Sequence, residues 1–268
     1  MLPSDEIESL GTNFNELKKV DVSALIKEVK KESAGGSGGD YTPHNQPWSA
    51  AFISHVALAG DSSFPTSRAH TGYADKIRKL RKEKGDDANW KTLDGTLYSP
   101  KKGDIVIQGR EGNKITFQGL DGKYSGKSHG DLVTGGDMKT KFQVIGGNVS
   151  DTVYAKNIKL KAKQFGMDLR YPVALGTDES SSSRQPYNVI LRPDPNKVNI
   201  NAMIAKAKEE WNFWHPDAKT PLSEANKKDK ESKANDTDTR GDEIFERLAD
   251  YWESAGLSRD RFGRDKQV

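Results

Sequence analysis

Five short segments separated by glycine-rich turns constrain the fold of this chain more than any other feature. Each segment is rich in β-branched residues or alternates apolar and polar residues, as a strand with one buried face does. All five lie between residues 103 and 160, and they read GDIVIQG, KITFQG, HGDLVTGG, FQVIGGN and VYAKNIKL. Because short turns join them, neighbouring strands should run antiparallel. The sequence predicts an antiparallel sheet of about five strands.

Two helices are predicted before these strands. Residues 47–60, PWSAAFISHVALAG, have Pro47 near a helix start, apolar residues at helical spacing, and Gly60 as a stop signal. Residues 67–85, SRAHTGYADKIRKLRKEKG, form a second helical pattern that ends at Gly85. Helices followed by an antiparallel sheet define the α+β class.

Composition divides the chain into four regions. Residues 1–34 carry a helical pattern, and residues 35–42 contain a Gly/Ser run that resembles an artificial tether. Residues 43–198 hold the helices and strands of one compact domain, in which residues 176–188 read as a polar loop. Residues 199–268 are again helical and amphipathic, so we expect added helices at both ends of the domain.

The composition also excludes several classes of partner and cofactor. The net charge of +3 is the small difference between 42 basic and 39 acidic residues, so no nucleic-acid partner is expected. No apolar run is long enough to span a membrane, and the first residues lack the pattern of a signal peptide. The chain has no cysteine, and its five histidines form no i, i+4 pair, so neither a metal site nor a cofactor is predicted. We expect a soluble protein made in the cytoplasm.

Three polar residues form a candidate catalytic set. Ser49 lies in the first turn of its predicted helix, where free backbone N–H groups favour a developing anion. His129 begins one predicted strand, and Asn148 ends the next. A sheet could therefore bring a base and its orienting partner to the start of the helix. A working nucleophile should also open onto a groove that admits a substrate.

The order of five blocks resembles a known superfamily. The blocks are PWSAAFISHVALAG, SRAHTGY, SPKKGDIVIQ, SHGDLV and IGGNVSDTV, and together they span roughly residues 43–160. They resemble the NlpC-like and CHAP superfamily of papain-type amidases and endopeptidases, most closely an uncharacterised bacterial branch with serine in place of the nucleophilic cysteine. The resemblance implies a papain-like domain that cleaves amide bonds in peptidoglycan peptide stems. It also implies that Ser49 is the nucleophile, His129 the base, and Asn148 the residue that orients the imidazole.

The serine leaves three interpretations open. Ser49 could be a working nucleophile whose proton passes to a hydrogen-bonded histidine. It could be a relic or a plain helix cap in a fold kept for binding. It could also stand where a nucleophilic cysteine has been replaced. In the second case the chain would be a catalytically inactive binding or structural component of a virion, secretion system or cell envelope, with a wall peptide or a protein as its partner.

Other residues near the candidate nucleophile each have a functional and a structural interpretation. His70 could line the cleft or be a packed structural histidine. Trp48 could form a wall of the substrate site or belong to the core. Gln46 and Tyr41 are candidates for the second oxyanion donor.

The partner of His129 also has an alternative. Asp131 lies two residues after His129 and so shares its strand face, where it could replace Asn148 as the orienting group. Geometry favours a residue from a neighbouring strand, so Asn148 is the predicted partner.

The C-terminal helices carry aromatic and apolar side chains on one face. They resemble helices that precede the nucleophile block in the similar branch, which suggests a tandem or permuted order. Alternatively, they are ordinary terminal helices or an arm that binds a protein partner. The aromatic and apolar side chains on this face are those of Trp211, Trp214, Phe245, Leu248, Tyr251 and Trp252.

If the protein acts on the cell wall, we expect it to reach its substrate by injection, lysis or secretion.

Overall fold

The computed structural model describes the second of two compact units, which spans residues 42–268. The predicted N-terminal helix and tether, with Tyr41 and Gln46, lie outside the described residues. Side chains are not described at 159–162, 170–173 and 241–242. The described residues are 47–110, 113, 115–120, 126–138, 141–149, 152–162, 170–173, 187–216 and 241–259.

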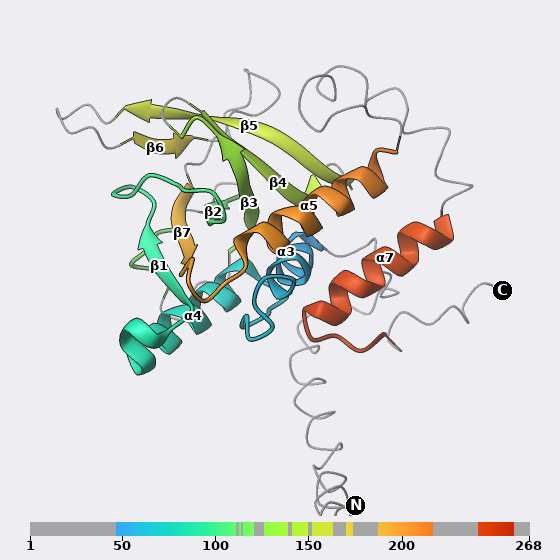
Figure 1. Ribbon diagram of the computed structural model, residues 1–268, viewed down its shortest axis with the longest axis horizontal. Coiled ribbons are helices and arrows are strands. Elements are labelled where there is room, and N and C mark those ends of the chain that lie inside the picture. The colour runs from blue at the N-terminus through green and yellow to red at the C-terminus, as the bar shows by residue number, and fades with distance from the viewer. Residues whose placement is uncertain are drawn as a thin grey trace, which may run out of the picture. The chain divides into compact units, whose positions relative to one another are not determined.

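The fold is α+β, with helices packed against one antiparallel sheet (Figure 1). Over the described residues the sheet has seven strands in the order β1-β7-β2-β3-β4-β5-β6, and every pair of neighbours is antiparallel. Strands β2 to β5 follow the chain as a meander, whereas β7 returns to lie between β1 and β2. The strands are β1 (Trp90–Asp94), β2 (Ile105–Gly109), β3 (Ser128–Gly136), β4 (Lys141–Val149), β5 (Thr152–Ala162), β6 (Arg170–Val173) and β7 (Tyr187–Pro193).

The predicted sheet is correct in kind but wrong in size. Four of the five predicted segments form β2 to β5, while the described part of 114–119 forms a turn closed by a bond from the Gly119 N–H to the Thr116 carbonyl, 3.2 Å. Strands β1, β6 and β7 were not expected. The polar loop predicted at 176–188 is wrong at its end, because Tyr187 and Asn188 already belong to β7.

The described helices are α3 (Ser49–Leu58), α4 (His70–Lys84), α5 (Ile200–Trp214) and α7 (Gly241–Ser254), with a 3-10 turn at Gly85–Asp87. Both helices predicted before the sheet are present. Gly85 ends α4 with a φ of 56°, which favours glycine. Asn199 starts α5, because its side chain accepts a hydrogen bond from the Ala202 N–H at 3.0 Å. None of these four helices is long and apolar enough to cross a membrane.

The sheet has apolar side chains on both faces. Strand alternation puts Leu132 in the cluster under the helices and its neighbour Val133 in a second cluster. Strand β6 contacts β7, although four strands separate them in the sheet order, so the sheet curls toward itself. This curl accounts for the burial of the second cluster, which contains Val106, Val133, Phe142, Val144, Ile158, Tyr187 and Ile190.

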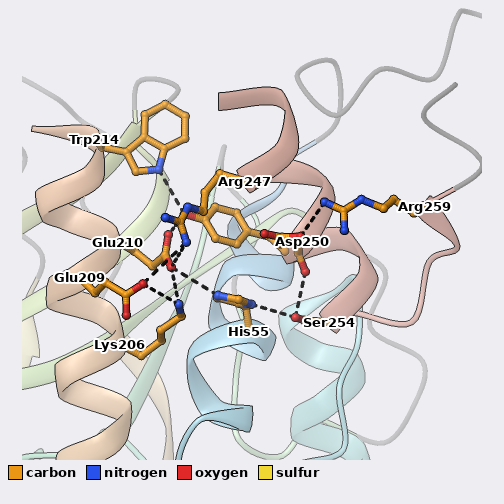
Figure 2. A network of polar contacts seen from close by, with 10 residues as sticks. His55, Lys206, Glu209, Glu210, Trp214, Arg247, Asp250, Ser254 and Arg259 are labelled. Atoms are coloured by element: carbon orange, nitrogen blue, oxygen red, sulfur yellow. Dashed lines mark hydrogen bonds and ion pairs between the residues drawn. The ribbon is translucent and has the colours of Figure 1, made fainter. Parts of the chain in front are cut away.

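A buried glutamate joins helices α5 and α7 to α3 (Figure 2). Glu210 of α5 is fully buried, and its carboxylate lies 3.0 Å from Lys206 Nζ and 3.2 Å from Arg247 Nη1. Tyr251 of α7 donates its hydroxyl to Glu210 at 2.6 Å, and His55 Nε2 of α3 lies 3.4 Å away. Because these partners come from three helices, the network holds α5 and α7 against α3.

The apolar faces of the C-terminal helices are used within the chain. Trp211 and Leu248 are fully buried, and Trp214 is partly buried. The Trp48 ring, one residue before Ser49, stacks on Trp214 with centroids 5.5 Å apart and lies 5.7 Å from Tyr251. Helices α5 and α7 therefore pack against the start of α3, where the candidate nucleophile lies.

We expect Glu210→Gln to lower the free energy of unfolding by about 2 to 3 kcal/mol at pH 7. Burial alone would raise the pKa of Glu210, but the nearby polar groups of His55, Tyr251 and Lys206, together with the charge of Arg247, lower it from 4.5 to about 2. Because folding lowers this pKa, the stabilisation is full above about pH 4.5 and is lost as the pH falls toward 2.

Urea unfolding at pH 7 and at pH 3 measures this difference. The matched control is Glu209→Gln, because the Glu209 side chain is 57% exposed and contacts the same Lys206. An exposed pair of this kind contributes less than about 1 kcal/mol. Equal losses for the two variants would contradict the role of Glu210.

Candidate active site

Ser49 is the first residue of α3, and its hydroxyl lies between two histidines. Ser49 Oγ is 2.9 Å from His129 Nδ1 and 3.0 Å from His70 Nε2. The N-cap residue of α3 is Trp48, which provides no side-chain hydrogen bond to the first turn. One interpretation proposed that Ser49 is the helix cap, but Trp48 holds that position. The Ser49 hydroxyl is instead directed at the two imidazoles.

Asp131 occupies the position predicted for Asn148. His129 Nε2 lies 3.0 Å from Asp131 Oδ1, so Ser49 and Asp131 engage the two ring nitrogens of His129. The two residues share a face of β3 because they are two positions apart. Asn148 has a φ of 56° and lies where the register between β4 and β5 shifts. The partner observed at His129 Nε2 is therefore the alternative, Asp131, and not the residue predicted for this contact, Asn148.

The Asp131 carboxylate is fully buried and ionised. Its second oxygen accepts hydrogen bonds from the Tyr187 hydroxyl and from Lys156 Nζ, the latter at 3.0 Å. Burial raises the pKa of Asp131, but the charges of Lys156 and His129 and the hydrogen bonds from His129 and Tyr187 outweigh burial and hold the pKa well below its ordinary value. The carboxylate is therefore an acceptor at neutral pH.

This charge fixes the tautomer of His129. Burial lowers the pKa of His129 to about 4; Asp131 opposes this shift and Lys156 adds to it. The imidazole is therefore neutral at pH 7 and carries its single proton on Nε2, facing the carboxylate. Nδ1 is left as an acceptor, and the Ser49 hydroxyl donates to it. A neutral imidazole that accepts the serine proton has the arrangement of a general base.

His70 is part of the site. It was predicted only to line the cleft, whereas in the structure it contacts Ser49 directly. It is the first residue of α4, is 2% exposed, and has its Nδ1 hydrogen-bonded to the Tyr73 hydroxyl. Burial, and next the neighbouring His129, lower the pKa of His70 well below its ordinary value, so this imidazole is also neutral. Its position in the block SRAHTGY was the sequence signal, but no pattern indicated contact with Ser49.

Three glycines make room for the site. A Cβ atom on Gly130 would lie 2.5 Å from His70 Nδ1, and one on Gly146 would lie 1.9 Å from Asp131 Oδ1. A Cβ on Gly147 would lie 2.5 Å from Phe52 Cβ, on the side where α3 packs. The glycines in HGDLV and IGGN thus allow the helix and the buried polar side chains to approach the sheet closely.

The site is enclosed among the described residues. Ser49 is 3% exposed, and Trp48 is a core residue with 1% exposure, not an exposed wall. A surface pocket of about 620 Å³ lies at the start of α5 and one of about 130 Å³ lies beside α4; neither includes Ser49. Neither of these two pockets corresponds to the groove predicted over Ser49, and the Ser49 side chain is buried among the described residues. Among the same residues, no group of three or more His, Asp or Glu side chains is arranged to hold a metal ion.

Fold and site define an α+β protein with a buried Ser-His-Asp arrangement at the start of a helix. Residues 12–193 match the model of DUF2272, described as an uncharacterized protein conserved in bacteria, and the chain belongs to this family. The matched region includes α3, α4 and the whole sheet and ends before α5. Comparison with curated proteins found no match, and comparison with solved structures found none.

We expect Gly146→Ala to displace Asp131 and to lower the free energy of unfolding by about 1 to 3 kcal/mol, because the added methyl group overlaps a buried carboxylate. Chemical unfolding measures the loss. The matched control is Gly135→Ala in β3, whose Cβ would meet its nearest neighbour, Gln143 Oε1, at 3.5 Å, an ordinary contact. If the two variants are equally stable, the close approach at Gly146 is not a constraint.

Proposed function

We propose that this protein is a hydrolase of amide bonds that acts on the peptide stems of bacterial peptidoglycan. Ser49 is the nucleophile, His129 the general base and Asp131 the orienting carboxylate. The observation that carries the proposal is the hydrogen-bonded chain from Ser49 Oγ through His129 to Asp131, with distances of 2.9 and 3.0 Å. Membership of a bacterial family and the resemblance to papain-type amidases support the substrate class.

The proposed reaction follows from the positions of the protons. Ser49 Oγ attacks the carbonyl carbon while its proton moves to His129 Nδ1, and the carbonyl electron pair becomes an oxyanion. Asp131 stabilises the imidazolium that forms. Collapse of the intermediate breaks the C–N bond, and His129 gives its proton to the leaving amine. Water then repeats the attack on the acyl-serine, again with His129 as base, and releases the acid.

The papain-like plan is part of this proposal. In the structure the candidate nucleophile begins a helix that contacts β3 and β4, and the base comes from β3. This is the arrangement that the resemblance implies for a papain-type domain. The start of α3 also supplies backbone N–H groups and the positive end of a helix dipole, both of which favour a developing oxyanion.

Digestion of purified peptidoglycan tests the function. The wild-type chain should release fragments with new amino and carboxyl termini in the stem peptides, which mass spectrometry identifies. Ser49→Ala should lose nearly all turnover, because no other hydroxyl of the described residues contacts His129 Nδ1. An unchanged product yield from Ser49→Ala would exclude Ser49 as the nucleophile.

One observation favours a second candidate function. Because Ser49 is only 3% exposed, the same fold could bind wall peptides or a protein without cleaving them. In that case both the wild type and Ser49→Ala would sediment with peptidoglycan, and neither would release fragments. The digestion experiment therefore separates the hydrolase from a binding or structural component.

The pH dependence provides a further prediction. Because His129 acts when neutral and its pKa is about 4, kcat/KM should fall only as the pH drops through about 4. Lys156→Met should move this acid limb to higher pH, because it removes a positive charge that disfavours the imidazolium. Lys141→Met, an exposed lysine on β4, is the control and should leave the limb in place. Coincident profiles for all three proteins would contradict the role assigned to Lys156.

A further inference from the structure

The triad leaves one buried group without a role. His70 Nε2 lies 3.0 Å from the same Ser49 oxygen that contacts His129, although a serine nucleophile needs only one base. His70 comes from α4, whereas His129 comes from β3, so two separate elements converge on one hydroxyl. A second buried imidazole at the reacting atom therefore needs an explanation.

Hydrogen-bond accounting determines which partner donates. The Ser49 hydroxyl has one proton and gives it to His129 Nδ1, because the other nitrogen of His129 faces the ionised Asp131. The contact with His70 Nε2 must then be an N–H group donating to the Ser49 oxygen. A neutral His70 with its proton on Nε2 has an acceptor at Nδ1, which is where the Tyr73 hydroxyl lies.

Tyr73 maintains this tautomer. Its side chain is fully buried, and burial together with the charge of Asp131 raises the pKa of its hydroxyl well above the ordinary value. The hydroxyl is therefore protonated and can donate to His70 Nδ1. Gly130, between His129 and Asp131, makes room for this pair, since a Cβ there would lie 2.5 Å from His70 Nδ1 and 3.0 Å from the Tyr73 oxygen. Each hydrogen-bonding proton in the series of contacts from Tyr73 to Asp131 is therefore assigned to one donor atom.

We propose that His70 is a second catalytic residue, a neutral imidazole whose Nε2–H stabilises the oxyanion formed when Ser49 attacks. This inference rests on the proposed hydrolase function. Before attack the N–H group donates to Ser49 Oγ. Once Oγ is bonded to the carbonyl carbon, it becomes a poor acceptor. The negative charge then lies on the former carbonyl oxygen of the substrate, two bonds from Oγ, and the His70 N–H group turns to donate to that oxygen. The N–H group then acts together with the backbone N–H groups at the start of α3.

The two histidines therefore have different tasks. His129 accepts the serine proton, because its Nδ1 is unprotonated and Asp131 stabilises the resulting imidazolium. His70 already has its proton on the nitrogen that faces Ser49, so it cannot accept another there. Its site is also unsuited to a cation, because it is buried and next to the imidazole that becomes charged during the reaction.

Two substitutions separate hydrogen-bond donation from packing. His70→Leu fills the site without an N–H donor, whereas His70→Gln places an amide N–H near the position of Nε2. We expect His70→Leu to lower kcat by roughly 100- to 1,000-fold with little change in KM, which is the usual effect of losing one oxyanion donor. His70→Gln should recover most of this loss. Far-UV circular dichroism and urea unfolding establish that both variants are folded.

A fluorophosphonate probe gives a second readout that does not depend on the natural substrate. Its phosphoryl oxygen takes the oxyanion position when Ser49 is phosphonylated, and intact mass shows one adduct that Ser49→Ala lacks. The rate of phosphonylation should fall in His70→Leu and recover in His70→Gln. Labelling without peptidoglycan cleavage would overturn only the substrate class, while the His70 variants still test the donor.

Three results would overturn the role of His70. The first is Ser49-dependent turnover or labelling at the wild-type rate in His70→Leu. The second is an equal loss in His70→Leu and His70→Gln, which would make the residue a packing element. The third is the absence of both cleavage and labelling in the wild-type chain, which would remove the nucleophile and the proposed function with it.

Discussion

The buried carboxylate of Asp131 is the constraint on which the site depends. Taking an ionised carboxylate out of water costs several kcal/mol unless charges and donors compensate for it. Here the donors come from three strands: His129 of β3, Lys156 of β5 and Tyr187 of β7. Strands β5 and β7 each lie two places from β3 in the sheet order, on opposite sides. They surround one carboxylate because the sheet curls, and that carboxylate sets the tautomer of His129.

Close approach between helix and sheet is the second requirement. Gly146 and Gly147 face opposite sides of β4, one toward the Asp131 carboxylate and one toward the first turns of α3. A side chain at Gly147 would separate α3 from the sheet and move Ser49 away from the imidazole, whereas one at Gly146 would displace the Asp131 carboxylate. In the sequence HGD, His129 and Asp131 supply the polar side chains of the site. Gly130 between them lacks a side chain and so leaves room for His70. The site is therefore specified as much by absent side chains as by reactive ones.

The C-terminal helices support the site from outside the region that matches the family. The match ends with β7, yet α5 and α7 pack on α3 and enclose Trp48, the residue before the candidate nucleophile. Glu210 links these helices to α3 through His55 and Tyr251. Because a buried charge requires its partners to stay in place, this network restricts the position of the whole helix that begins with Ser49.

The sequence by itself determined the local elements: α3 and α4 from helical spacing and glycine stops, β2 to β5 from alternation, and Ser49 and His129 from the order of their blocks. Only the tertiary structure decided which residues meet. Sequence reasoning preferred Asn148, yet Asp131 holds His129, and nothing local indicated that His70 reaches Ser49 or that β7 inserts beside β2. A pattern reports which face a side chain occupies. Its partners depend on register, sheet curl and helix docking, which contacts between distant segments determine.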